Sequence, residues 1–200
     1  MPNSLRASSP GRAARGPYSV TKRNRMKTEP ITPEGYDLLL REFKFLKDVE
    51  KPRVNREKQV AAELGDRSEN AEYHAAKEKL RHIDKRLFYL NGMIEKTQII
   101  DPAELSHERV HFGSTVTLFD LETDTEERYT ICGVLESEPE QGLISIHAPL
   151  SRGMLGKEEG DQFSVALPTG KKEYEVVAIA YIPVFSLKKS IRTEKDFSFK

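Results

Sequence analysis

Two stretches of the chain carry apolar residues at alternating spacings of three and four, the pattern of an amphipathic helix. The first follows Thr32-Pro33-Glu34, where Thr is a favoured N-cap and Pro suits the first helical position. Because Pro52 has no backbone N–H, we expect it to bend or locally break this helix. The apolar positions are Tyr36, Leu39, Phe43 and Leu46, and the same phase resumes at Val60 and Leu64.

The second stretch keeps a seven-residue repeat without interruption, which is typical of a coiled-coil seam. A short segment containing Gly65 separates it from the first stretch, so we expect an antiparallel helical hairpin over residues 29–101. With roughly 30 residues in each helix, the arm would be about 45 Å long and too thin for a globular core. The seam positions are Tyr73, Ala76, Leu80, Ile83, Leu87, Leu90 and Ile94.

After Asp101-Pro102 the period changes towards two, which indicates strands. The whole chain is therefore predicted to be α+β, a hairpin followed by a mostly antiparallel β domain over residues 102–185. Residues 186–200 are polar and predicted to be a loose tail. The expected strands are 115–120, 128–134, 143–146, 162–167 and 174–181, with a short helix or turn near Met154.

Composition narrows the class of protein. The 32 basic and 32 acidic residues balance, which suggests a soluble protein and not a diffuse nucleic-acid coat. Residues 1–28 hold seven basic residues and no acid, and are predicted to be a disordered head. No apolar run is long enough to span a membrane. The single Cys132 excludes an intramolecular disulfide, fits a reducing cytoplasm, and suggests a buried strand thiol.

The stretch "LGDRSENAEY" at residues 64–73 places carboxylates at the bend of the predicted hairpin. One interpretation is capping, because Asp66 and Glu69 have capping-box spacing and acids suit a helix N-terminus. Ser68 is a rival cap. The other interpretation is a Mg²⁺ site, which two carboxylates can hold only weakly unless a partner supplies further ligands. A metal shared with a partner could then activate water for phosphodiester hydrolysis.

Segments in both predicted domains resemble the Gre family of bacterial transcript-cleavage factors. The similarity runs from about Met26 to Pro183, and the tip motif with Glu50-Lys51-Pro52 is most similar to the GreB branch. The segments are "ITPEGYDLLLREFKFLKDVEKPRV", "LGDRSENAEYHAAKEKLRHIDKRLFYL", "LISIHAPLSRGMLGKEEGD" and "YEVVAIAY".

The resemblance implies an arm that enters the secondary channel of bacterial RNA polymerase. Asp66 and Glu69 would be the catalytic pair, holding Mg²⁺ jointly with the polymerase and orienting the water that cleaves the backtracked nascent RNA 3′ end. The factor would stimulate the polymerase's own nuclease, would not be a free-standing enzyme, and is expected to be a monomer. DNA binding is a further property that the family implies.

Residues around the tip and along the arm are candidate contacts to RNA or polymerase. Tyr73 has two interpretations, packing in the seam or stacking on a nucleobase. Arg67 could solvate the bend or contact an RNA phosphate. The net charge of residues 33–97 is only +1 (14 basic minus 13 acidic), so an ordinary solvated face competes with a basic RNA path. The candidates are Arg67, Ser68, Asn70 and Tyr73 at the tip, and Arg53, Arg56 and Lys77 on the arm.

For the second domain the resemblance implies an FKBP-like fold that docks at the rim of the channel. The loop His147-Ala148-Pro149 is the expected docking segment. It departs from the family, whose members commonly carry a polar residue followed by Ser-Pro, so its detailed contacts are in doubt. A lone His on such a loop is more often a plain surface residue than a ligand.

Three hypotheses for the function remain. The first is the transcript-cleavage factor. The second is a non-catalytic regulator that binds the same channel, although inhibitory relatives alter the tip and this chain keeps Asp66 and Glu69. The third is a structural coiled-coil dimer with a β binding module, which the heptads alone would permit.

Overall fold

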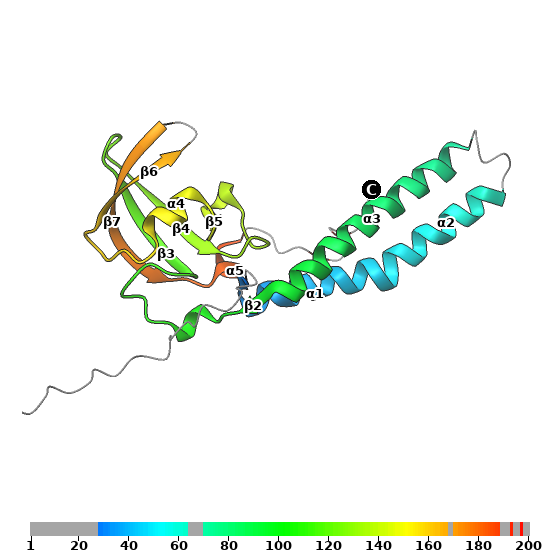
Figure 1. Cartoon of the computed structure of the whole chain (residues 1–200), viewed down its shortest axis with the longest axis horizontal. Coiled ribbons are helices and arrows are strands. Elements are labelled where there is room, and N and C mark those ends of the chain that lie inside the picture. The colour runs from blue at the N-terminus through cyan, green and yellow to red at the C-terminus, as the bar shows by residue number, and fades with distance from the viewer. Residues whose placement is uncertain (1–27, 64–69, 168–169, 189–192, 194–196, 198–200) are drawn as a thin grey trace, which may run out of the picture.

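The computed structural model describes residues 28–63, 70–167, 170–188, 193 and 197. A long helical hairpin extends away from a β domain at its base (Figure 1). Within the described ranges, no helix is both long and apolar enough to cross a membrane. The hairpin contains β1 (Glu29–Ile31), α1 (Pro33–Phe45), a π-helical turn (Leu46–Glu50), α2 (Lys51–Glu63), α3 (Ala71–Lys96) and β2 (Thr97–Ile99).

The first helix begins and is distorted where the sequence predicts. Thr32 is the N-cap of α1, and its side chain accepts a hydrogen bond from the Gly35 N–H at 3.1 Å. The π-helical turn lies directly before Pro52, and the Lys51 N–H bonds to the carbonyl of Leu46, five residues back. Pro52 has no N–H to offer the preceding turn, which explains a wider turn at this place. The helix is therefore distorted beside Pro52 by a wider turn, and it continues into α2 without a break.

This turn changes which residues form the seam. A π-helical turn holds about one residue more than an α-helical turn, so later positions move by one along the chain. Val54 is fully buried and Ala61 is 3% exposed, whereas Val60 is 58% exposed. The prediction that Val60 resumes the seam is therefore wrong, and Leu64 lies outside the described residues. The buried hairpin core is Ile31, Leu39, Leu46, Val54, Ala76, Leu80, Ile83 and Leu90.

The β domain is a five-stranded sheet with the order β5-β4-β3-β7-β6. All its strand pairs are antiparallel except β4–β5, which confirms the predicted α+β class with a mostly antiparallel sheet. A short helix, α4 (Pro149–Met154), buries Leu150 and Met154 in the core of this domain. The strands are β3 (Ser114–Asp120), β4 (Thr125–Cys132), β5 (Leu143–Ser145), β6 (Gln162–Leu167) and β7 (Gly170–Tyr181).

A buried carboxylate joins the β domain to the base of the hairpin. Glu136 is 2% exposed and accepts hydrogen bonds from the Thr32 hydroxyl, the Thr32 N–H at 3.3 Å and the Gly133 N–H at 2.9 Å. A Cβ on Gly35 or Gly133 would overlap the Glu136 carboxylate, so both positions require glycine for this close approach. Leu135 packs against the hairpin core beside them.

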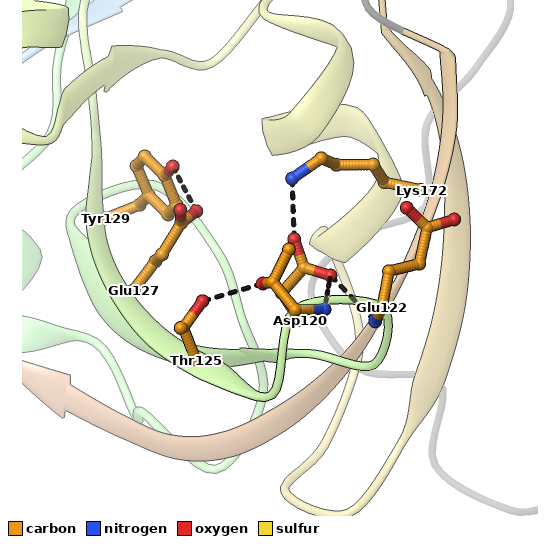
Figure 2. A network of polar contacts seen from close by, with 7 residues as sticks. Asp120, Glu122, Thr125, Glu127, Tyr129 and Lys172 are labelled. Carbon is orange, nitrogen blue, oxygen red and sulfur yellow. Dashed lines mark hydrogen bonds and ion pairs between the residues drawn. The ribbon is translucent and has the colours of Figure 1, made fainter.

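A second polar cluster closes the turn between β3 and β4 (Figure 2). The buried Asp120 accepts hydrogen bonds from the Glu122 N–H at 2.9 Å and from the Lys172 ammonium at 2.6 Å. These bonds hold the pKa of the Asp120 carboxyl below its usual value. The Tyr129 hydroxyl donates to Glu127 at 2.6 Å. Because the groups satisfy one another, this cluster stabilises the turn and ties it to β7.

Of the predicted polar tail at residues 186–200, the structure describes only residues 186–188, 193 and 197, so the loose tail stays a prediction. A short helix, α5 (Val184–Leu187), lies at the junction of hairpin and β domain (Figure 1). Val184 is buried with Cys132 and Leu143. Phe197 is 7% exposed and packs against Phe45 of α1. These described residues after β7 therefore contact both the β domain and α1.

Candidate functional site

The acidic stretch joins the ends of α2 and α3 that lie farthest from the β domain (Figure 1). Asp66, Arg67, Ser68 and Glu69 belong to residues 64–69, which lie outside the described residues. The flanking structure is clear, because α2 ends at Glu63 and α3 begins at Ala71. Connectivity alone therefore assigns the predicted catalytic pair to the distal end of the hairpin.

Asn70 is the N-cap of α3. Its side-chain oxygen accepts a hydrogen bond from the Tyr73 N–H at 3.0 Å, and its amide donates to the carbonyl of Ala61 at 2.7 Å. The sequence interpretation that Asp66 or Ser68 caps this helix is therefore wrong. Asn caps helices as well as Asp or Ser does, and its amide can also bond the end of α2, which a carboxylate cannot. Asn70, predicted as a contact to RNA or polymerase, thus has a structural role.

Tyr73 lies in the first turn of α3 and is half-buried. Its ring meets the ring of His74 edge-on, with centroids 5.7 Å apart and planes at 77°. The side chain therefore keeps part of its surface accessible close to the acidic stretch. This position agrees with either interpretation of Tyr73 drawn from the sequence.

A groove of about 1090 Å³ follows one face of the hairpin between α2 and α3. We call it the lysine groove, after the cations Lys51, Lys58, Lys77, Arg81 and Lys85 that line it. Phe88, which is 85% exposed, lies in the same groove. Sequence reasoning noted these cations but did not place them on one face, and it missed Phe88. The other lining residues are Asn55, His74, Glu78, Leu80 and Asp84.

The cations of the lysine groove are only partly neutralised. Lys51 pairs with Asp84 at 2.7 Å and Arg81 with Glu78 at 2.7 Å. The three remaining cations are Lys58, Lys77 and Lys85, and no carboxylate in the described part of the chain pairs with them. This face of the hairpin therefore carries a local positive charge, although the net charge of residues 33–97 is close to zero.

Arg53 and Arg56 line a second groove, of about 560 Å³, which shares no residue with the first. Arg53 donates two hydrogen bonds to the buried Glu50, at 2.9 and 2.6 Å, and also pairs with Glu57. The bonds to Glu50 raise the pKa of the Arg53 guanidinium. The structure thus separates the three predicted arm contacts, because Lys77 lies in the other groove. Arg53 balances a buried carboxylate, which makes its role mainly structural.

The expected docking loop has an internal partner. The His147 Nε2 atom lies 2.6 Å from the Glu29 Oε2 atom of β1, so this His links the β domain to the base of the hairpin. It is therefore more than the isolated surface residue that the sequence suggests. Ala148 is the N-cap position of α4, and Pro149 is its first residue.

The described residues contain no group of three or more His, Cys, Asp or Glu side chains that could hold a metal ion. Cys132 is fully buried beside Val184, and burial raises the pKa of its thiol to about 12. This agrees with the predicted buried strand thiol. A protonated, inaccessible thiol is a poor nucleophile.

Comparisons with known proteins identify the class. The family model "Transcription elongation factor, N-terminal" matches residues 29–99, and "Transcription elongation factor, GreA/GreB, C-term" matches residues 105–181. The chain belongs to the GreA/GreB family of transcription elongation factors.

Individual relatives agree with this assignment. The chain is 49% identical over 156 residues to transcription elongation factor GreA of Nautilia profundicola, a match that covers 78% of this chain and 96% of the relative. It is 50% identical to GreA of Nitratiruptor sp. over 78% of this chain and 95% of that protein. Because these relatives carry the name GreA, the predicted GreB branch is not confirmed.

Among solved structures, GreA factor homolog 1 of Thermus thermophilus matches at 23% identity with a TM-score of 0.37. The match covers 76% of this chain and 99% of that one. This score is too low to add to the family assignment.

Proposed function

We propose that this elongation factor stimulates cleavage of backtracked RNA by bacterial RNA polymerase. The observation that carries the proposal is the motif Gly-Asp-Arg-Ser-Glu-Asn at residues 65–70, joining the distal ends of α2 and α3 in a Gre-family chain. The acids Asp66 and Glu69 are then the groups delivered to the polymerase. The factor contributes side chains to another protein's active site and is not itself an enzyme.

The shape of the hairpin supports delivery into a narrow passage. The 26 residues of α3 span about 39 Å at 1.5 Å per residue. The hairpin is two helices thick, whereas the β domain is a broader body at its base (Figure 1). The hairpin enters the secondary channel, and the β domain remains at the rim.

Asp66 and Glu69 are oxygen ligands of the kind that Mg²⁺ prefers, and two carboxylates are too few to hold the ion tightly. The pair would hold it together with ligands from the polymerase. The ion, when bound, supplies Lewis acidity and an activated water. The chain's own contribution is to carry both carboxylates to the RNA 3′ end and to orient that water.

The lysine groove provides a path for the extruded RNA. Three of its cations, Lys58, Lys77 and Lys85, have no ion-pair partner among the described residues and lie between the distal end and the base of the hairpin. They would contact phosphates, and the exposed Phe88 would offer a surface for a base to stack on.

Stalled, backtracked elongation complexes incubated with Mg²⁺ and the protein test the cleavage role. We expect short 3′ RNA fragments with the wild type and only the polymerase's basal cleavage with Glu69→Gln or Asp66→Asn. Glu72→Gln is the matched control, because Glu72 is an exposed acid in the first turn of α3 and should cleave normally. Equal cleavage by Glu69→Gln and wild type would exclude the metal role.

Two further outcomes separate the alternatives. Binding of the wild type to polymerase without any stimulated cleavage would identify a non-catalytic regulator of the channel. A stable dimer with no affinity for polymerase would identify a structural coiled coil.

The RNA path is tested by replacing Lys58, Lys77 and Lys85 with Ala together. We expect half-maximal cleavage at a higher factor concentration and a weaker dependence of that concentration on salt, because fewer counterions are released. Lys44→Ala removes an exposed cation of α1 outside the groove and serves as the control. An unchanged salt dependence in the triple variant would contradict a role for the groove in binding phosphates.

A further inference from the structure

The chain after β7 contacts the joint between the two domains at four described positions. We call its four described contact residues, Val184, Phe185, Lys188 and Phe197, the C-terminal strap. They lie after residue 181, where the C-terminal family model ends. The family match therefore assigns them no role, although each contacts a residue within the matched ranges or beside one that does.

The first anchor of the strap is apolar and lies on the β domain. Val184 is 2% exposed and forms a small buried cluster with Cys132 of β4 and Leu143 of β5. Phe185 packs against the same cluster. Removing these apolar side chains from water favours the docked position of residues 184–185.

The second anchor is an ion pair at the edge of the joint. The Lys188 ammonium lies 2.7 Å from the Glu138 carboxylate, and the Lys188 side chain is only 7% exposed. The same ammonium lies 5.4 Å from the centroid of the Phe185 ring. A cation this buried is costly to leave without its partner, so the pair fixes the strap beside residues 135–138.

The third anchor reaches the hairpin. Phe197 is 7% exposed, and its ring centroid lies 6.2 Å from that of Phe45, the last residue of α1, at an interplanar angle of 53°. A cavity of about 50 Å³ lies where α1, residues 135–138 and the strap meet. Phe185, Lys188 and Phe197 line it together with Gly35, Leu39 and Glu42 of α1. The strap thus contacts both domains at one place.

We propose that the C-terminal strap fixes the direction of the hairpin relative to the β domain. Other links between the domains are the bond of Glu136 to Thr32, the pair of His147 with Glu29, and the packing of Leu135 against the hairpin core. Thr32 and Glu29 lie at the start of the hairpin, whereas Phe45 is the last residue of α1, so a contact at Phe45 acts on a longer lever. Over a lever of about 40 Å, a 10° rotation would move the tip by roughly 7 Å. The strap therefore positions the acidic tip without touching it.

The orientation can be measured on the free, full-length protein by double electron–electron resonance. Gln59→Cys and Glu126→Cys place spin labels at exposed positions on α2 and on β4. The native Cys132 stays unlabelled because it is fully buried. We expect one narrow distance distribution, and a broader one when Phe197→Ala is added. Leu121→Ala, a truncation of an exposed apolar residue at the β3–β4 turn, is the control.

Lys188→Ala is the second variant, and it removes a contact that lies wholly outside the helices. If Phe197→Ala loses helical circular dichroism, its distance distribution reports unfolding, and Lys188→Ala then tests whether the strap fixes the orientation. A broadened distribution with native circular dichroism supports the strap. Distributions identical to that of the wild type in both variants would overturn it.

The expected effect of the strap on RNA cleavage rests on the proposed function. The measurement of hairpin orientation is independent of that function. We expect Phe197→Ala to raise the factor concentration for half-maximal cleavage several-fold while the rate at saturation stays near that of the wild type, because the channel restrains the arm once it is bound. Glu69→Gln should instead lose the rate at saturation. If the wild type cleaves nothing, the proposed function fails, and the distance distributions still test the strap.

Discussion

At the residue scale, Asn70 shows how one side chain serves two helices. Its oxygen caps α3 through the Tyr73 N–H, and its amide closes the end of α2 through the Ala61 carbonyl. Both bonds lie at the border of the acidic stretch. The separation between the ends of α2 and α3 therefore depends on this residue.

We expect Asn70→Ala to lower the free energy of unfolding of the hairpin by about 1 kcal/mol, the usual cost of losing an N-cap. Asn70→Asp should fall between Ala and wild type, because Asp keeps the acceptor and loses the donor to Ala61. Urea denaturation followed by circular dichroism at 222 nm measures both. Equal stability of Asn70→Ala and wild type would contradict the capping role.

At the scale of the element, the π-helical turn decides the packing of the first helical segment. The heptad pattern before Leu46 predicts a seam at residue 60, and the seam instead passes through Val54 and Ala61. Sequence periodicity could locate the helix and its distortion. It could not give the shift, because a Pro can be accommodated by a kink, a break or an extra residue in a turn.

Because of this shift, the same Val→Ala substitution should change stability by different amounts at positions 54 and 60. Val54→Ala should destabilise the protein by about 2 kcal/mol, because a fully buried side chain leaves a cavity. Val60→Ala should change stability by less than about 0.5 kcal/mol, because Val60 is 58% exposed. Thermal or urea unfolding of both variants checks the difference. Similar losses in the two would mean that the heptad phase continues through the turn.

At the scale of the whole molecule, the joint between hairpin and β domain depends on a buried acid. Burial raises the pKa of the Glu136 carboxyl, although hydrogen bonds from Thr32 and Gly133 oppose the shift. An acid with a raised pKa in the folded state binds more protons there than in the unfolded state. Its contribution to stability is therefore largest below its ordinary pKa and declines as pH rises through the raised value.

We expect the difference in unfolding free energy between wild type and Glu136→Gln to fall as pH rises from about 4.5 towards neutrality. The Gln side chain has a similar size and does not titrate, so the difference isolates Glu136 from other ionising groups. Urea titrations of both proteins at several pH values provide the measurement. A difference that does not vary with pH would show that Glu136 has the same pKa in both states.

The sequence by itself determined the hairpin, the mostly antiparallel β domain, the helix distortion near Pro52 and the acidic motif at the bend. These features are encoded locally, in periodicities of 3.5 and 2 residues and in cap and turn residues a few positions apart. The family resemblance rested on the same short motifs, and the family models matched the chain over residues 29–99 and 105–181.

Only the tertiary structure decided which cations share a groove, how the seam passes the π-helical turn, and how the two domains are joined. Thr32 and Glu136 are separated by 104 residues, and Lys188 and Glu138 by 50. Such pairs leave no periodic signal, because their energy comes from desolvation and close approach after folding. The contacts of Val184 and Phe197 left no signal in the sequence for the same reason, because they depend on the Cys132 cluster and on Phe45.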